Sequence, residues 1–358
     1  MSLTVAQHPV PRLAALATAV PPFDLLQHDV AGHAASLFAP VEGGFHRLAP
    51  MYRNARIDRR HSCVPLDWFL EEHGFPERNA LFLEHATNLL AEAAAKALGQ
   101  AGLHPSEVDT IVTVSSSGIA TPALDARVMA RLPFRREVQR LPIFGLGCAG
   151  GVLGLSRAAA MAKAAPDSNV LLLVVELCSL TFRRQDRSKS NVVATALFGD
   201  GAAAAIVTCR GDTVPTSAPR LGPWGEHTWP DSLDVMGWDI ANDGLKVVFS
   251  RDIPTLVRDD LRPVIDDFLR RNGLTIGDID EFVCHPGGAK VIDALEECLE
   301  LRHGTLTHAR EVLRDHGNMS AATVLFVLRE ALDEQPVGRR LMTTLGPGFT
   351  AAMMMIDA

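Results

Sequence analysis

The sequence contains the same structural unit twice, and this duplication limits the possible folds more than any other feature. Residues 102–112 (GLHPSEVDTIV) match residues 273–283 (GLTIGDIDEFV) in their glycine, acidic and apolar positions. Each segment is typical of a helix that ends at a glycine, followed by a short turn and a buried strand. We therefore expect a chain built from two similar halves.

A second repeat follows each copy of the first. Gly147-Cys148 precedes an apolar helical segment and a strand at 170–175, and Gly317-Asn318 precedes another helical segment and a strand at 341–345. Two halves related by a pseudo-two-fold axis would bring both helix starts toward the middle of the molecule. We expect one half at residues 1–209, which carries Cys148, and the other at 210–358.

Apolar runs separated by helical segments predict an α/β fold. We expect buried strands at 12–20, 110–114, 141–144, 170–175 and 203–208, and a long alanine-rich helix at 79–102. With 358 residues, of which 47% are hydrophobic, the chain can bury more than one domain-sized core.

Charge and cysteine usage exclude several classes of function. The net charge is -8 and there is no dense Lys/Arg tract, so we expect binding neither to nucleic acid nor to an anionic membrane. The six cysteines show no CxxC pairs, so we expect no metal site and a reduced, intracellular setting. No apolar run approaches the ~18–20 residues that span a bilayer. The sequence thus favours a soluble, cytoplasmic protein.

Cys148 lies in the glycine-rich segment 145–151 (GLGCAGG), between a predicted strand and a predicted helix. Backbone N–H groups and the dipole at a helix N-terminus favour a thiolate there. The same letters satisfy GxGxxG from Gly145 to Gly150, and Glu176 ends the next strand, as in NAD(P)-dependent oxidoreductases. A buried, inert cysteine is the third interpretation.

Two polar residues of the second half complete a possible catalytic set. His285, in FVCHPGG, ends a strand at the edge where α/β folds bind ligands, whereas Asn318, in HGNMSAA, could be a helix N-cap alone. With Cys148 they suit decarboxylative carbon–carbon bond formation, in which the cysteine holds an acyl group. The histidine and asparagine would donate hydrogen bonds to a malonyl thioester carbonyl. We also expect His285 to pair with the Cys148 thiolate before loading.

Five segments of the chain together resemble the type III polyketide synthases, the chalcone synthase superfamily. They are GLGCAGGVLGL around Cys148, ALFGDGAAAAIV at 196–207, FVCHPGG around His285, GNMSAATVLFVL from Gly317, and LGPGF at 345–349. The resemblance implies a thiolase-like α/β fold, with two pseudo-symmetric halves in a five-layered αβαβα arrangement. It also implies that Cys148 is the acyl-carrying nucleophile, and that His285 and Asn318 promote decarboxylation.

The resemblance implies roles for other residues and for partners. Phe198 would be a gate between a CoA tunnel and the cavity, and a loop would shape the cavity wall. By residue type alone, Phe198 could equally be an ordinary core residue and the loop an ordinary tight turn. That loop is Gly346, Pro347, Gly348 and Phe349. Acyl-CoA and malonyl-CoA would be the substrates, without a further cofactor, and Arg47 and Arg53 are candidates for CoA binding. A homodimer is also implied, with which an exposed apolar edge near Thr121 is compatible.

Departures from the plant chalcone synthases indicate a different cavity. Val247 stands where those enzymes carry a Phe, Cys178 where they carry a Thr, and Thr121 where they carry a Met. Cys178 and Thr181 are equally readable as residues at the end of a core strand. Because an isopropyl group replaces a ring, we predict a medium- or long-chain fatty acyl-CoA starter and an alkylpyrone or alkylresorcinol-type product.

Three alternatives stand beside this interpretation. A β-ketoacyl synthase III-like enzyme uses the same three residue types, but is expected to follow its histidine with Gln-Ala-Asn rather than Pro286-Gly287-Gly288. An NAD(P)-dependent dehydrogenase would explain neither the cysteine nor the two polar motifs downstream. A catalytically silent partner protein of the same fold would have no need for all three residues. The type III polyketide synthase therefore remains the preferred prediction.

Overall fold

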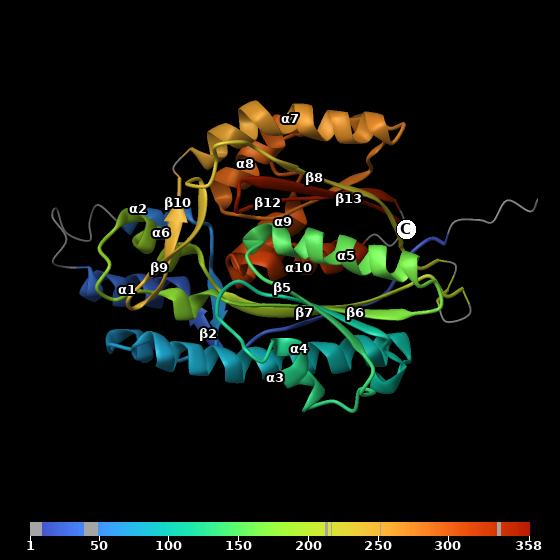
Figure 1. The fold of residues 1–358 in the computed structure, drawn as a ribbon. Helices are drawn as coiled ribbons and strands as arrows, with labels where there is room; N and C mark the ends of the chain where they lie inside the picture. Colours follow the sequence, from blue (N-terminus) through green and yellow to red (C-terminus); the bar gives the residue numbers. More distant parts are fainter. Residues whose placement is uncertain (1–8, 39–48, 212–213, 216, 251, 335–337) are drawn as a thin grey trace, which may run out of the picture.

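Helices and strands stack in five alternating layers in this computed structural model (Figure 1). The structure describes residues 9–38, 49–211, 214–215, 217–250, 252–334 and 338–358. Two helices, α5 (Gly150–Ala164) and α10 (Thr323–Glu334), lie side by side in the middle layer, between two sheets. The prediction of an α/β fold with five layers is confirmed.

The first sheet belongs to the first half of the chain. Its strands, in spatial order, are β1 (Arg12–Ala19), β7 (Asp200–Thr208), β6 (Asn169–Leu177), β4 (Thr110–Val114) and β5 (Gln139–Ile143). Helix α3 (Phe75–Ala101) covers one face together with the short α4 (Leu124–Met129), and α5 covers the other. Alternate residues of β6 enter two different cores, since successive side chains of a strand point to opposite faces. Strands β6 and β7 are buried along their whole length.

The second sheet repeats the arrangement. Its strands are β11 (Glu281–Cys284), β12 (Arg339–Gly346), β13 (Thr350–Asp357) and β8 (Arg220–Thr228). Helices α7 (Ile253–Arg271) and α8 (Ala289–Cys298) form the outer layer, and α9 (Thr307–His316) leads toward the centre. The two sheets join where Arg12 of β1 pairs with Arg220 of β8. The chain passes from the first sheet to the second between β7 and β8. The predicted boundary between the two halves of the chain, after residue 209, stays a prediction.

The duplicated units take up the predicted structure. In the first half α3 is followed by a 3-10 turn at Pro105–Glu107 and by β4; in the second, α7 is followed by Ile276–Asp278 and β11. Helix α3 begins at Phe75 rather than at the predicted residue 79, because Gly74 lies at its N-cap and Pro76 suits its first turn.

The prediction that residues 141–144 form a buried strand is wrong. Strand β5 lies at the edge of the first sheet, and among the described strands it pairs with β4 alone, so Leu141 is 36% exposed and Phe144 62% exposed. Apolar composition alone does not distinguish an edge strand from a central one.

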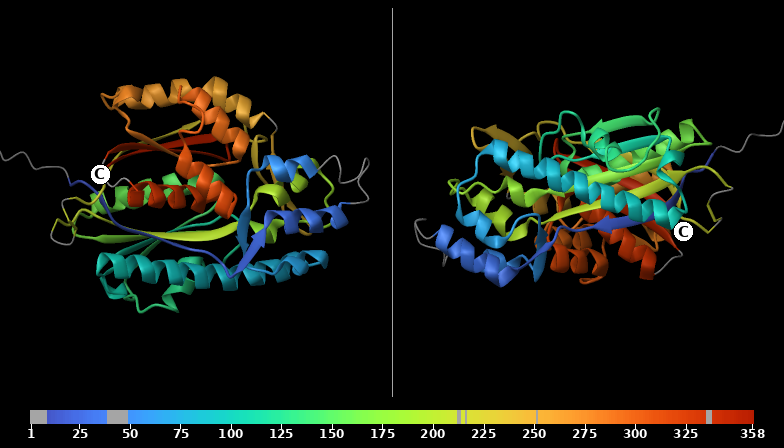
Figure 2. Two further views of the ribbon diagram at one scale, coloured as in Figure 1. Left: turned by 180° about the vertical axis from the view of Figure 1, so that it is seen from behind. Right: turned by 90° about the horizontal axis from the view of Figure 1, so that it is seen from below.

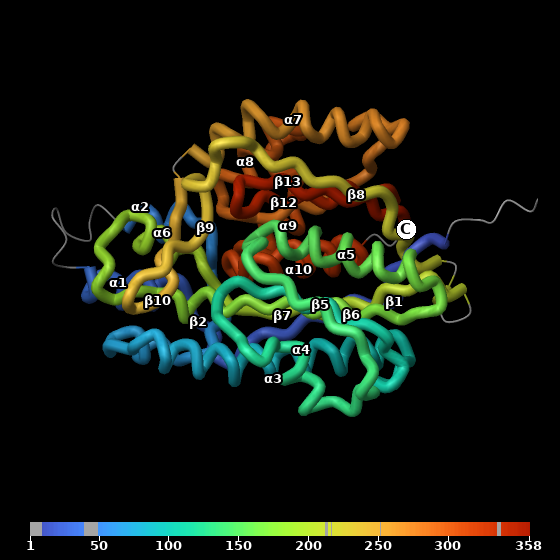
Figure 3. Tube along the Cα trace, in the orientation of Figure 1, coloured from blue at the N-terminus to red at the C-terminus, as the bar shows by residue number. Residues whose placement is uncertain are grey.

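A group of smaller elements projects from one end of the layers (Figures 2 and 3). It contains β2 (Phe23–Leu26) paired with β3 (Arg59–Ser62), α1 (Gln27–Leu37), α2 (Ala49–Asn54), the 3-10 turn Leu66–Leu70, α6 (Lys189–Leu197), and the hairpin β9 (Met236–Ala241) and β10 (Gly244–Phe249). In the described part of the chain, no helix combines the length and apolar character that crossing a membrane requires.

Candidate active site

Cys148 lies in the 3-10 turn Gly147–Ala149 that leads directly into α5. Gly145 (φ 92°) and Gly147 (φ 46°) adopt left-handed conformations that side chains rarely allow, which explains these two glycines of the motif. The Cys148 side chain is buried, and its thiol donates a hydrogen bond to the Ser320 hydroxyl over 3.7 Å. The predicted position at a helix start is confirmed.

The structure brings Cys148, His285 and Asn318 to one cavity near the middle layer. His285 directly follows β11, and Asn318 lies between α9 and the turn that leads into α10. The nucleophile candidate therefore comes from the first half of the chain and its two partners from the second. The other lining residues are Met236, Phe249, Ile253, Gly287, Val291, Leu295, Thr343, Thr344 and Leu345.

Backbone hydrogen bonds fix Asn318 in place. Its N–H donates to the Leu197 carbonyl (2.8 Å), and its own carbonyl accepts from Gly199 (3.0 Å). The side-chain oxygen accepts from the Ser320 N–H (2.8 Å), and the amide nitrogen donates to the Gly287 carbonyl (3.2 Å). The expected N-cap role is not observed, because Met319 is the N-cap of the following 3-10 turn, and the Asn318 side chain closes a local turn onto the Ser320 N–H instead. The Asn318 amide nitrogen contacts the segment that carries His285.

His285 is buried, and neither of its ring nitrogens has a hydrogen-bond partner among the residues that the structure describes. Burial lowers the pKa of His285 to about 3, so the ring is neutral at pH 7. Its backbone N–H donates to the Thr343 carbonyl (3.0 Å), which holds the residue at the end of β11. A buried polar ring without a protein partner, facing a cavity, is available for a ligand.

The expected ion pair between a Cys148 thiolate and a histidinium is not present. Burial raises the pKa of Cys148 to about 12, the hydrogen bond with Ser320 opposes this rise, and nearby Glu176 adds to it. The helix N-terminus does not outweigh the loss of water around the sulfur. Within the described residues both groups are therefore neutral, and the thiol donates to Ser320 instead of to His285.

Glu176 is linked to Cys148 through the Ser320 hydroxyl. Its carboxyl group is fully buried and accepts from the Ser116 hydroxyl (2.7 Å), the Ser116 N–H (3.0 Å) and the Ser320 hydroxyl (3.5 Å). Burial raises the pKa of Glu176, and hydrogen bonds from Ser117 and Ser116 oppose this rise. Ser116 and Ser320 were not predicted from the sequence, since neither stands in a spacing that signals chemistry.

The same geometry excludes a dinucleotide at the glycine-rich turn. A pyrophosphate needs open space beside the glycines and a reachable acid at the end of the next strand. Here a Cβ on Gly151 would lie 2.4 Å from the Ala321 carbonyl oxygen, and one on Gly147 would lie 2.7 Å from the Pro347 ring. Protein fills that space, and Glu176 is turned into the core.

Phe198 lies between the cavity of Cys148 and a second one. Its ring centroid is 5.7 Å from that of Phe249, which lines the first cavity, while Phe198 itself lines the second. Val247 and Cys178 are buried in the same small cluster as Phe198. Phe249 was missed from the sequence, although its position two residues after Val247 places both on one face of β10.

The loop at 346–349 packs behind the nucleophile rather than along the described wall of its cavity. Gly346 is pressed against Ala149 and the Leu146 carbonyl, Pro347 lies against Gly147, and Phe349 packs on Trp229 with ring centroids 5.2 Å apart. Leu345, which precedes the loop, is among the described lining residues, and the four loop residues are not. The loop therefore supports the turn that carries Cys148.

The remaining predicted residues are dispersed. Thr181 is buried and lines the second cavity, whereas Thr121 is exposed and lines neither. Arg53 is exposed on α2, and Arg47 lies outside the described residues.

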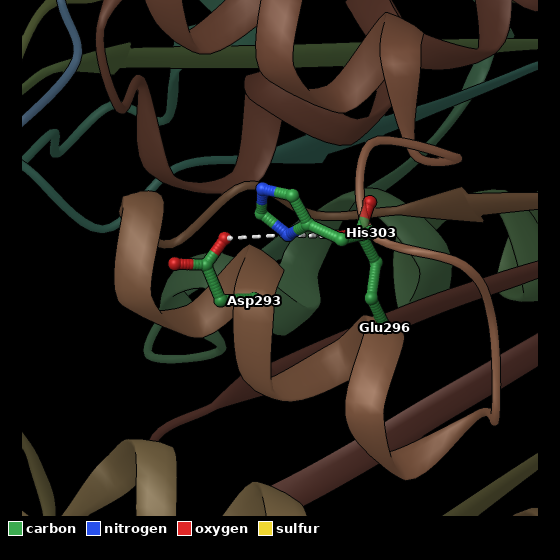
Figure 4. A group of neighbouring side chains, drawn as sticks. All are labelled: Asp293, Glu296 and His303. Carbon is green, nitrogen blue, oxygen red and sulfur yellow. Dashed lines mark ion pairs between the residues drawn. The ribbon is translucent and has the colours of Figure 1, made fainter.

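A cluster of Asp293, Glu296 and His303 lies outside the cavity, on and after α8 (Figure 4). Arg310 donates to Asp293 (2.9 Å) and Glu296 (2.5 Å), and the N–H groups of Gly304 and Leu306 donate to Glu296 (3.0 Å each). A protein cation already balances these carboxylates, so the arrangement is that of an ion-pair cluster.

Comparisons with known proteins show what this chain is similar to. The N-terminal domain model of the chalcone and stilbene synthases matches residues 71–211, and the C-terminal domain model matches residues 226–357. A 1,3,6,8-tetrahydroxynaphthalene synthase of Streptomyces peucetius is 38% identical over 96% of this chain and 92% of its own. An alpha-pyrone synthesis polyketide synthase-like protein of Mycobacterium tuberculosis is 27% identical over 96% and 90%.

The fold comparison gives the same result. The crystal structure of the 1,3,6,8-tetrahydroxynaphthalene synthase of Streptomyces coelicolor, described as a bacterial type III polyketide synthase, superposes with a TM-score of 0.91 at 28% identity. The match covers 97% of this chain and 99% of that one. The thiolase-like fold expected from the sequence is confirmed.

Proposed function

This chain belongs to the chalcone and stilbene synthase family, the type III polyketide synthases, and from that premise we propose which reaction its site performs. The family consists of acyl-transferring enzymes that use acyl-CoA and malonyl-CoA. In the proposed reaction a medium- or long-chain fatty acyl group on Cys148 is extended with malonyl units. The extended chain is then closed to an alkylpyrone or alkylresorcinol-type ring.

The first step is transfer of the starter to Cys148. The sulfur attacks the acyl-CoA carbonyl, the new carbon–sulfur bond forms, and CoA leaves as its thiol. The proton of the Cys148 thiol passes through His285 to the departing sulfur. The His285 ring has a nitrogen without a hydrogen-bond partner among the described residues, which can accept this proton.

The second step is decarboxylation of malonyl-CoA. An imidazole N–H of His285 and the Asn318 amide would donate hydrogen bonds to the thioester oxygen. The bond between the α-carbon and the carboxylate breaks, CO2 leaves, and the electron pair stays on the α-carbon. The resulting negative charge is shared with the thioester oxygen. The resulting enolate carbon attacks the acyl carbonyl on Cys148; a carbon–carbon bond forms and the bond to sulfur breaks. The Cys148 sulfur leaves as a thiolate and takes up a proton from solvent water, which restores the thiol. No redox change occurs, so we expect no further cofactor.

The observation that carries the proposal is the cavity in which the unpartnered His285 ring, the fixed Asn318 amide and the Cys148 thiol meet. The α-pyrone in the name of one relative supports an alkylpyrone product, and the replacement of a ring by Val247 supports an aliphatic starter. We also propose a homodimer, for which the exposed apolar side chains of the β5 edge provide a surface.

Mass spectrometry of products tests the proposal. The purified protein is incubated with malonyl-CoA and a panel of acyl-CoA starters, beside a Cys148→Ala variant. We expect starter-dependent, cyclised polyketides from the wild type alone. A product that stops after one condensation would instead indicate a ketoacyl synthase III-like enzyme. A folded wild type that yields no product from any starter would refute the proposal.

A further inference from the structure

The backbone of Ser320 is left-handed, with a φ of 47°. Serine is uncommon in this conformation, which glycine adopts without strain. The residue is buried, and it begins the turn Ser320–Ala322 that leads into α10. A strained residue beside a reacting group indicates that its side chain has a function there. No step of the proposed reaction has yet used this side chain.

The Ser320 hydroxyl lies between the Cys148 thiol and the Glu176 carboxyl group. It accepts a hydrogen bond from the thiol (3.7 Å) and donates one to Glu176 (3.5 Å). The Ser320 N–H donates separately to the Asn318 side chain (2.8 Å), which fixes the backbone. The hydroxyl proton, in contrast, can rotate about the carbon–oxygen bond toward either neighbour.

Glu176 does not depend on the hydrogen bond from Ser320. Its carboxyl group also accepts from the Ser116 hydroxyl (2.7 Å), the Ser116 N–H (3.0 Å) and the Ser115 hydroxyl (3.5 Å). The contact with Ser320 is 0.8 Å longer than the shortest of these, and a hydrogen bond of 3.5 Å is weak. The Ser320 proton can therefore leave Glu176 at little cost.

The Cys148 sulfur needs a hydrogen-bond donor whenever it is negative. It loses its proton when it attacks the starter, and it departs as a thiolate in each condensation. The sulfur belongs to a buried side chain, and a buried charge without a donor is unfavourable. The titratable groups around it are Glu176, Cys178 and His285, of which Glu176 opposes a negative sulfur.

We propose that the Ser320 hydroxyl stabilises the Cys148 thiolate by turning its O–H from Glu176 to the sulfur. When the thiol proton leaves for His285, the O–H donates to the negative sulfur. It turns back to Glu176 once the sulfur carries an acyl group, and no covalent bond of Ser320 forms or breaks. The inference rests on the proposed function, because it takes Cys148 as the nucleophile.

The electrostatics of the site support this assignment. Burial raises the pKa of Cys148, the Ser320 hydrogen bond lowers it, and the Glu176 charge raises it further. Loss of the hydroxyl and loss of the carboxylate charge should therefore change the reactivity of the thiol in opposite directions. A residue that only fills space would not produce this pair of opposite effects.

The rate of Cys148 alkylation by iodoacetamide, followed by peptide mass spectrometry from pH 7 to pH 9, tests the proposal. Ser320→Gly removes the hydroxyl and suits the left-handed backbone. We expect it to slow alkylation by about 10-fold at each pH, because a hydrogen bond to a charged group changes a pKa by about one unit or more. Glu176→Gln should make alkylation faster than in the wild type.

Ser156→Ala is the control, since this buried serine lies on the same helix as the cysteine turn and donates to the Leu153 carbonyl (2.8 Å). Its alkylation rate should equal that of the wild type. A Ser320→Gly rate within twofold of the wild type overturns the assignment. Slower alkylation of Glu176→Gln also overturns it, because the effect would then be one of packing.

The infrared S–H stretching band tests the hydrogen bond without a reagent and without a Ser320 variant. The difference spectrum between the wild type and Cys148→Ala isolates the band of this thiol. We expect it at a lower frequency than that of a free thiol in an apolar solvent, and a band at the free-thiol frequency overturns the assignment. These tests use no substrate, so a wild type that shows the expected shifts but forms no polyketide refutes the proposed function alone.

Discussion

Replacing Gly346 by alanine should displace the nucleophile without touching the cavity. A Cβ at this position would lie 2.6 Å from the Ala149 Cβ, 2.7 Å from the Ala149 nitrogen and 2.7 Å from the Leu146 carbonyl oxygen. Ordinary contacts begin at 3.4 Å, so the loop and the turn must separate by about 0.7 Å. Two of the three atoms belong to the backbone that flanks Cys148, and no side-chain rotation can relieve the contact.

The expected cost has two parts. Overpacking of this kind costs ~1–3 kcal/mol of unfolding free energy. A misplacement near 1 Å at a reacting group can cost ~100-fold in rate, so a shift of about 0.7 Å should lower kcat by roughly 10- to 100-fold. In free energy the two losses are of similar size, since a 10- to 100-fold drop in kcat corresponds to about 1.4–2.7 kcal/mol.

Product formation and thermal melting are measured together for the wild type, Gly346→Ala and a control, Gly99→Ala. Gly99 lies within α3 and has no neighbouring atom within 4 Å of an added Cβ, so its variant should keep activity and melt no lower than the wild type, since alanine favours a helix over glycine. If Gly346→Ala keeps kcat within twofold of the wild type, the support of Cys148 by this loop is refuted.

Three further predictions use other parts of the site. Val247→Phe should shorten the accepted starter, since a ring beside Phe198 restricts its movement; unchanged chain-length profiles in competition assays would contradict this. Because the pKa of Cys148 is about 12, its alkylation by iodoacetamide should still accelerate between pH 7 and pH 10; a rate that is flat from pH 7 would indicate a paired thiolate. Burial lowers the pKa of His316 to about 4, below the unfolded value of 6.5. The unfolded chain therefore binds a proton at this histidine more readily than the folded protein does. The folded state loses stability for this reason as pH falls from about 6.5 to 4. His316→Asn should thus show a smaller drop in melting temperature between pH 7 and pH 5 than the wild type.

The sequence predicted those features that repeat or alternate. The two copies of the helix, turn and strand unit gave the two sheets, and the equivalent helix starts gave the central positions of Cys148 and Asn318. His285 was found because a strand end in an α/β fold is a place for ligands, and no such regularity marks Ser116 or Ser320.

What could not be predicted depends on contacts between distant segments. The residue type of Glu176 does not show whether its carboxylate faces a nucleotide or the core. The packing of its strand against the segments that carry Ser116 and Ser320 decides this. The thiolate prediction was wrong because the helix effect is local, whereas the removal of water around Cys148 comes from the whole fold. The exposure of Phe144 likewise depends on which strand stands last in the sheet.

The assembly of the cavity from both halves has a consequence for synthesis of the chain. A ribosome adds ~5–20 residues per second, so His285 follows Cys148 after roughly 7 to 30 seconds. During that interval α5 has no α10 beside it, and the side of the helix that later meets Ala321 is uncovered. The nascent first half thus presents an apolar helix and an unshielded thiol to the surrounding medium, and oxidation or aggregation at this stage would remove the protein before it ever bound a substrate.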